Sequence, residues 1–517
     1  MKINFQSRKI VAILSSSAGM VQQATQIVVG FVYRTIFLMV LAKEYFGING
    51  LFTHILQMFS ITELGIGVAL MYSMHKYYAK QDMDMIRGLI TFYKKVYRLV
   101  ALAVLLLGLC FFPFINSVVD VSQVPADVNI GRVYFLFLIQ SVVGYLYIYK
   151  RSILEASQKQ YIDYLFNSLV LIIGYVVRTA ALLIWKNFEL LLLLGIASDI
   201  LMEWTFYLWV GHRYRDVFNG KGSVPREEKR EIYKNTAGLM CHKIGTIVVA
   251  STDSIILSKY VSLAAVGIYS NYVTLVSAVY GLTAKAFFGL QPTVTNYVVA
   301  NSREDSRELY FKILYINMWL ACFTTVCLYL LLNPFIGEIW LDKSFLFSRE
   351  VVMLICFQHY LQMARLTTHC FISSCGLFNR DKIRPLVESI INLTISVLLV
   401  KRMGIVGVFV GTCVSGLVTY FWREPYLILH KTLGGGYGKH LLTMFFWTVL
   451  TVAMCLLGDA ALRQIPDSVV GFTVKLLAAG IGSNLLILLL TFRSEGFRYV
   501  WNMLAGILRN RGIEESD

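Results

Sequence analysis

Apolar stretches follow one another along almost the whole chain, and only short polar gaps separate them. About 20 consecutive apolar residues in a helix are enough to cross the hydrocarbon core of a bilayer. We therefore predict an all-α polytopic membrane protein with about 14 transmembrane helices and no separate soluble domain. The predicted spans are residues 12–42, 47–73, 90–115, 130–150, 162–186, 189–211, 236–259, 263–290, 312–336, 347–374, 384–402, 404–429, 440–459 and 468–492.

The longest gap between spans divides the chain near its middle. It reads HRYRDVFNGKGSVPREEKREIYKN and occupies residues 212–235. Its charge, glycines and proline favour a cytoplasmic linker between an N-terminal lobe, 1–211, and a C-terminal lobe, 236–430. The segments GLFTHILQMFS (50–60) and GIYSNYVTLVS (267–277) are similar and occupy equivalent spans of the two lobes. This pattern predicts a parallel repeat around a central cavity, an arrangement used by alternating-access transporters.

Two spans remain after the second lobe, within residues 431–492, and a tail follows at 493–517. The tail mixes aromatic and aliphatic residues with several arginines. Two interpretations stay open, an amphipathic helix on the cytoplasmic face and a polar tail.

Composition and charge agree with a membrane location. Charged residues make up 15% of the chain, whereas soluble proteins carry about 25%. The net charge of +16 could suggest nucleic acid as a partner, but most Lys and Arg residues lie in alternate gaps between spans. Cytoplasmic loops of membrane proteins are enriched in these residues. The alternation therefore predicts a cytoplasmic N-terminus and a cytoplasmic C-terminus, and no nucleic-acid partner.

Polar residues recur every three or four positions in several spans, which places them on one helix face. A buried charge in a membrane is costly, so such faces generally line a bundle interior or a hydrated cavity. Close helix packing through small and amide residues is the other interpretation of each face. The candidate cavity residues are Arg34, Lys285, Arg365, Arg178, Lys243, Gln23, Gln26, Gln57, Asn271 and Gln362.

Two acids on these faces have two candidate roles. Glu63 and Asp253 could carry a coupling ion, H⁺ or Na⁺, or could neutralise Arg34 and Lys243. The candidate set remains positive on balance, which suits an anionic substrate, and arginine binds phosphate through two parallel hydrogen bonds. The cysteines are scattered singly and no histidine pair has a third ligand at metal spacing. We therefore expect no metal site and no cofactor.

Several stretches together resemble one family. They are EYFGINGLF (44–52), ELGIGVAL (63–70), TDSIILSKY (252–260), GLFNRDKIRPLVESIINLTISVLL (376–399) and GIVGVFVGTCVSGLVTYFWREPY (404–426). They resemble the Wzx-type polysaccharide flippases of bacteria, members of the multidrug/oligosaccharidyl-lipid/polysaccharide (MOP) exporter superfamily, which also contains the MATE exporters and the lipid II flippases. The resemblance covers most of residues 30–430 and implies a MATE-like, pseudo-symmetric pair of six-helix lobes.

The resemblance also implies a substrate and a location. Wzx proteins move undecaprenyl-pyrophosphate-linked oligosaccharide repeat units across the bacterial cytoplasmic membrane for capsule, exopolysaccharide or O-antigen synthesis. Polysaccharide polymerase and chain-length machinery are the partners implied. Lipid II flippases line their cavity with arginines from the first, second and eighth helices. Arg34 and Lys285 match this pattern, whereas the second span carries Glu63 in place of a basic residue.

Three other functions are alternatives to a Wzx-type flippase. A lipid II flippase is the nearest, because only the glycan differs. A cation-coupled drug exporter needs cavity acids, commonly in the first helix, and the span at 12–42 has none. A membrane polymerase or ligase generally has a large outer loop with basic residues. The longest outer gap here, INSVVDVSQVPADVN (115–129), is short and has none. We therefore expect a transporter and not an enzyme.

Overall fold

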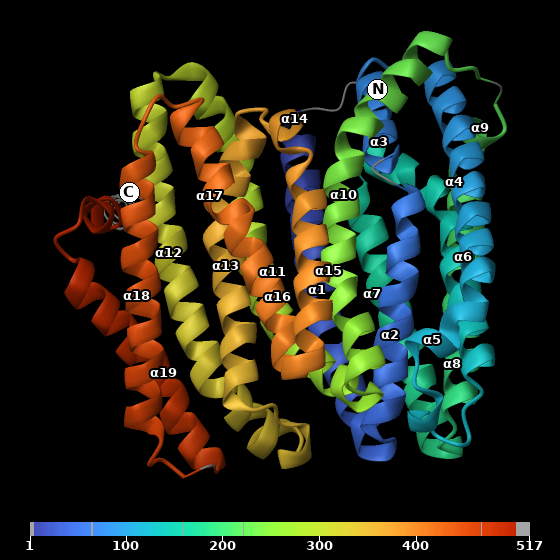
Figure 1. Cartoon of the computed structure of the whole chain (residues 1–517). Coiled ribbons are helices and arrows are strands. Elements are labelled where there is room, and N and C mark those ends of the chain that lie inside the picture. The colour runs from blue at the N-terminus through green and yellow to red at the C-terminus, as the bar shows by residue number, and fades with distance from the viewer. Residues whose placement is uncertain (1–4, 64–65, 158, 221, 467, 503–517) are drawn as a thin grey trace, which may run out of the picture. The chain divides into compact units, whose positions relative to one another are not determined.

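The computed structural model describes all residues except 1–4, 64–65, 158, 221, 467 and 503–517, and it is helical from end to end (Figure 1). No strand occurs among the described residues. Ten helices in this part of the chain are long and apolar enough to cross a membrane. The predicted class, an all-α polytopic membrane protein, is therefore confirmed.

The other predicted spans are also helical, but they are interrupted or more polar. The span at 47–73 is divided by a 3₁₀ turn, η1 (Ser60–Glu63). The spans at 236–259, 347–374 and 384–402 correspond to helices that carry more polar side chains. The full number of spans stays a prediction.

The chain divides into two compact units, residues 1–267 and 268–517. The first unit contains, in order, α1 (Phe5–Val40), α2 (Lys43–Phe59), η1, α3 (Ile66–Ala79), α4 (Met83–Phe111), η2 (Phe112–Phe114), α5 (Ile115–Val118), η3 (Val121–Gln123), α6 (Ile130–Ala156), α7 (Gln160–Trp185), α8 (Phe188–Arg213), α9 (Arg215–Phe218) and α10 (Arg226–Tyr260). Within it α1 packs on α7, α6 packs between α4 and α8, and α10 runs along α2 and α3.

The second unit begins inside α11 (Leu263–Ala300). It continues with α12 (Arg303–Pro334), η4 (Phe335–Trp340), η5 (Lys343–Phe345), α13 (Arg349–Ser374), α14 (Phe378–Asp381), α15 (Arg384–Met403), α16 (Ile405–Val418), α17 (Tyr420–Pro425), η6 (Tyr426–His430), α18 (Tyr437–Leu462) and α19 (Val469–Thr491). Helix α12 packs against α13, α18 and α19, and α15 packs along α16.

Local sequence explains where many helices begin and where two of them change pitch. The side chains of Asp82, Asn129 and Ser302 each accept a hydrogen bond from a backbone N–H in the first turn of the following helix, which is the usual N-cap arrangement. Pro334 and Pro425 each precede a π-helical turn, η4 and η6. Proline lacks a backbone N–H, so the regular helix cannot continue through it without rearrangement.

The segment predicted as an inter-lobe linker, 212–235, is packed into the first unit. Val224 and Ile232 belong to the buried core that α3 and α4 share with α6. Gly222 lies so close to the backbone of α4 that a methyl group there would overlap the carbonyl oxygen of Asp84. Helix α10, which the sequence assigned to the C-terminal lobe, therefore belongs to the first unit by its contacts.

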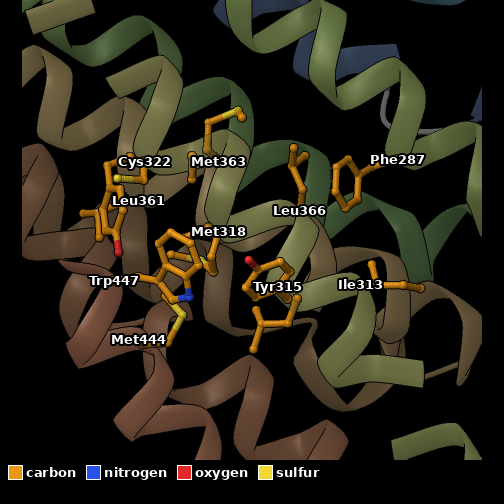
Figure 2. Packing of buried hydrophobic residues seen from close by; sticks show 14 of the residues in the cluster. Phe287, Ile313, Tyr315, Met318, Cys322, Leu361, Met363, Leu366, Met444 and Trp447 are labelled. Carbon is orange, nitrogen blue, oxygen red and sulfur yellow. The ribbon is translucent and has the colours of Figure 1, made fainter. Parts of the chain in front are cut away.

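The core of the second unit joins α12 to the last two helices. Trp447 of α18 packs on α12 with its ring centre 5.8 Å from that of Tyr315 (Figure 2). Trp319 of α12 donates a hydrogen bond of 2.9 Å to Asn484 of α19. The hydroxyl groups of Tyr315 and Thr491 lie 2.7 Å apart. Helices α18 and α19 are thus structural parts of the second unit.

Candidate functional site

Arg34 lies in the last third of α1, the helix that packs most closely on α7. Arg34 is only 9% exposed. The guanidinium carbon lies 4.3 Å from the ring centre of Phe46, which is within the range of a cation–π contact. The next ring along α1, Tyr33, contacts Tyr175 of α7 at 4.8 Å between centroids. Arg34 is therefore a buried cation over an aromatic ring of the first unit.

Arg178 of α7 is bound to an acid. Its guanidinium group donates hydrogen bonds to both carboxylate oxygens of Asp199 on α8, and Gln140 of α6 donates to the same carboxylate at 3.2 Å. Gly174 and Gly195 make room for this pair, because a methyl group at either position would overlap the Arg178 side chain. The positive charge of this candidate cavity residue is balanced within the first unit.

A third arginine of the first unit, Arg151, was not among the candidates from sequence. It lies in the last two turns of α6 and donates hydrogen bonds of 2.7 Å to Asp163, 2.8 Å to Asn167 and 2.7 Å to Glu203. These partners come from α7 and α8, so one side chain connects three helices. We call this group the first clasp.

The second unit contains a comparable group, which we call the second clasp. Arg365 of α13 donates to Glu424 of α17 at 2.8 Å, and Thr368 donates to the same carboxylate at 2.8 Å. The buried Arg384 at the start of α15 pairs with Asp381 at 2.8 Å, with Glu388 and, at 3.4 Å, with Glu424. Sequence reasoning found Arg365 but missed Arg384 and Glu424. Both lie in stretches quoted above for the family resemblance, which was the available signal.

The remaining candidates are distributed over both units. In the first unit Gln23 is half-buried, Gln26 and Gln57 are exposed, and Asp253 of α10 is buried. Lys243 lies on α10, but its side chain is outside the described part of the structure. In the second unit Lys285 and Gln362 are exposed. Asn271 of α11 is 0% exposed, and both polar atoms of its side chain are without a hydrogen-bond partner among the described residues.

Glu63 lies at the break in the second predicted span. It ends η1, the turn between α2 and α3, and accepts a hydrogen bond of 2.6 Å from the hydroxyl of Tyr97 on α4. The Tyr97 ring stacks on Tyr93 at 4.6 Å. Interrupted helices in transporters commonly mark substrate or ion sites, so the position is consistent with either role predicted for Glu63.

One further buried acid lies outside the predicted spans. Glu228, in the first turn of α10, accepts hydrogen bonds from Tyr77, Ser73 and Lys76 at 2.7, 2.9 and 3.2 Å. Burial acts to raise the pKa of this carboxyl, but the three donors outweigh it and hold the pKa below its ordinary value. This group fixes the start of α10 to α3.

Comparison with known proteins shows the family to which this chain belongs. Residues 15–287 match the family described as "Polysaccharide biosynthesis protein". The chain belongs to this family. No match was found among curated proteins.

Two solved structures show that this family member has a known fold. One is the lipid II flippase MurJ in an inward closed conformation, which is 15% identical with a TM-score of 0.64. It covers 93% of this chain and 99% of its own. The other is an inward-facing MATE family transporter of the MOP superfamily, 12% identical with a TM-score of 0.60, covering 81% of this chain and 99% of its own. The MATE-like fold implied by the sequence resemblance is confirmed.

Proposed function

We propose that this protein is a flippase for undecaprenyl-pyrophosphate-linked oligosaccharide repeat units. It moves them from the inner to the outer leaflet of the bacterial cytoplasmic membrane for capsule, exopolysaccharide or O-antigen synthesis. The observation that carries the proposal is the match of residues 15–287 to a polysaccharide biosynthesis family in a chain with a MurJ-like fold. The polymerase and chain-length machinery are the partners expected on the product side.

Arg34 is the residue we assign first to the pyrophosphate. A planar guanidinium group can form two parallel hydrogen bonds with phosphate oxygens. Lys285 is the second candidate. Arg178 and Arg365 are held by Asp199 and Glu424, so we assign them to shaping the site. Lys243, Gln23, Gln26, Gln57, Asn271 and Gln362 are proposed to contact the polar part of the substrate.

Transport by alternating access needs an energy source. Two acids are the candidates for coupling transport to an ion gradient. Glu63, at the break between α2 and α3, and Asp253, buried in α10, are proposed to bind H⁺ or Na⁺. A carboxylate within a membrane span is costly unless it is paired or functional. Both acids therefore remain candidates for coupling.

A lipid II flippase is the main alternative, because the lipid II flippase MurJ shares the fold over 93% of this chain. Both substrates would present a lipid-linked pyrophosphate to the same site. A cation-coupled drug exporter is the second alternative, given the MATE structure. The first predicted span has no acid between residues 10 and 42, which favours an anionic substrate over a cationic drug.

Deleting the gene and analysing lipid-linked intermediates tests the proposal. A flippase deletion should trap the complete repeat unit on its lipid carrier in the inner leaflet, with loss of surface polysaccharide. A polymerase deletion would instead leave the same unit in the outer leaflet, where membrane-impermeant reagents reach it. Trapped lipid II would identify the peptidoglycan alternative. Unchanged lipid intermediates with altered drug sensitivity would support drug export and refute the proposal.

A further inference from the structure

After α19 the chain makes a turn at residues 492–494 and then forms a further helix over residues 495–502, near the end marked C in Figure 1. One side of this stretch is bound to the second unit. Phe497 and Val500 pack against the core that includes α12 and α18. At Gly496 the backbone is so close to Tyr315 of α12 that a methyl group would overlap its ring. The helix therefore has a defined position on the protein.

The side facing away from the core carries aromatic rings. Trp501 is 62% exposed and Phe492, just before the helix, is 51% exposed. Trp501 stacks on Phe497 with a centroid distance of 6.2 Å, so its ring is held in place. Exposed tryptophan rings at the ends of membrane spans are typical of the bilayer–water interface. An amphipathic helix that lies at the bilayer–water interface inserts its apolar side chains between headgroups.

Positive charges surround these rings. Arg493 and Arg498 are exposed, and the Arg493 guanidinium carbon lies 5.2 Å from the ring centre of Phe492. From the neighbouring helices, Lys312 reaches within 5.0 Å of the Tyr499 ring, and Lys439 pairs with Glu495 at 3.3 Å. Among the described residues, the acids paired with these cations are Glu495 and Glu308, the latter 2.6 Å from Lys312. In this described part of the surface, cations therefore outnumber acids.

We propose that this C-terminal surface, formed by Phe492, Arg493, Arg498, Trp501 and Lys312, binds the headgroups of anionic membrane lipids. The loop charges predict that this end of the spans faces the cytoplasm, so the lipids would be those of the inner leaflet. Arginine and lysine supply the attraction to lipid phosphate, and the exposed rings supply insertion at the interface. The inference is independent of the substrate assigned above, since none of these residues belongs to the proposed transport site.

The test uses the full chain in lipid nanodiscs and the fluorescence of Trp501. The Trp501 signal is the difference between the natural protein and Trp501→Phe. Quenching by phosphatidylglycerol brominated on its acyl chains is compared with quenching by brominated phosphatidylcholine at equal mole fraction. We expect stronger quenching by the anionic lipid. Arg493→Gln and Arg498→Gln should each lower that preference on the order of fivefold, and high salt should lower it as well.

A matched control removes one positive charge at the other end of α18, away from the C-terminal surface. Arg463 is exposed at the other end of α18, so Arg463→Gln should leave the preference unchanged. Three outcomes would overturn the proposal. They are quenching of Trp501 by aqueous iodide but by neither lipid, equal quenching by the two lipids, and full loss of the preference on adding soluble glycerol phosphate. The last outcome would indicate a site for free phosphate in place of a lipid surface.

Discussion

At the scale of single residues, Arg34 and Arg178 of the first unit differ in the groups that contact the guanidinium. Arg178 is enclosed by Asp199 and two glycines, whereas Arg34 lies over the ring of Phe46. A buried ion pair depends on close geometry, because the attraction must offset the cost of removing both charges from water. The space that Gly174 and Gly195 leave therefore contributes to the geometry of this pair.

Gly195→Ala tests this dependence on space. The added methyl carbon would lie 2.5 Å from Nε and 2.7 Å from Cγ of Arg178, so the arginine must move away from Asp199. We expect a loss of about 1–3 kcal/mol in stability, the usual cost of overpacking, measured by thermal unfolding in detergent. Gly144→Ala in α6 is the control, since nothing lies within 4 Å of a methyl group there. Equal effects of the two changes would contradict the prediction.

Glu228 gives a prediction about pH. Its pKa in the folded protein lies below the ordinary value, because the donors Tyr77, Ser73 and Lys76 outweigh the effect of burial. The stability contributed by the ionised carboxylate is thus fully present above a pH of about 4.3, the unfolded pKa. It is lost as pH falls through the folded pKa. The melting temperature of the natural protein should fall more steeply below that pH than that of Glu228→Gln, and parallel curves would count against this.

At the scale of elements, each unit holds three neighbouring helical segments together with a clasp. In the first unit Arg151 joins α6, α7 and α8. In the second unit Arg365 and Arg384 join α13, α15 and α17 through Glu424. The order along the chain is Arg, Asp, Glu in both units, namely Arg151, Asp163 and Glu203, then Arg365, Asp381 and Glu424. The pairing differs, because Asp381 binds Arg384 and not Arg365.

Arg384→Gln should weaken the second unit strongly. The side chains of Arg384 and Asp381 are 2% and 1% exposed, so the change leaves a buried carboxylate without its main partner. Such a loss costs about 3–5 kcal/mol. Arg402→Gln, at the exposed end of the same helix, should change stability by less than about 0.5 kcal/mol. Thermal unfolding of both variants measures the difference, and similar melting temperatures would show that the clasp contributes little.

The sequence could predict most helices but not their partners. Apolar runs set where helices form, and the polar faces on them identified Arg34, Arg178 and Arg365. Which acids bind Arg178 and Arg365 depends on how the helices are rotated against one another. The pattern of apolar and polar residues in a single sequence does not give this rotation. The break at η1 was missed for a similar reason. Glu63 is bound by Tyr97, a residue of another helix, and a local pattern cannot reveal such a contact.

At the scale of the whole molecule, the proposed flippase activity makes Arg34 a test case. Arg34→Gln should lower polysaccharide export about tenfold or more, since a charge-assisted hydrogen bond to phosphate contributes about 1.5–3 kcal/mol. The amount of protein in the membrane should stay unchanged. Lys401→Gln, at an exposed site of α15, is the control of equal charge. Normal export by a well-expressed Arg34→Gln protein would refute the role of Arg34.

A second prediction at this scale concerns which helices move together. The contacts of Glu228 with Ser73 and Lys76 place α10 with α3. We expect a cross-link between cysteines at positions 73 and 228, in a background without native cysteines, to leave export intact. Cells carrying the cross-linked protein provide the measurement. Export that stops on oxidation and returns on reduction would show that α10 separates from α3 during transport.

The packing of α12 against α18 and α19 has a consequence for how the protein is made. Helices α1 to α10 have been synthesised when the ribosome reaches residue 267, so the first unit can assemble while synthesis continues. Helix α12 is synthesised early in the second unit, but the side-chain hydrogen bonds of its Trp319 and Tyr315 require Asn484 and Thr491 of α19. The core of the second unit therefore stays incompletely packed until α19 has been synthesised. A nonsense mutation before the codon of Asn484 would leave a complete first unit attached to a second unit whose core lacks α19.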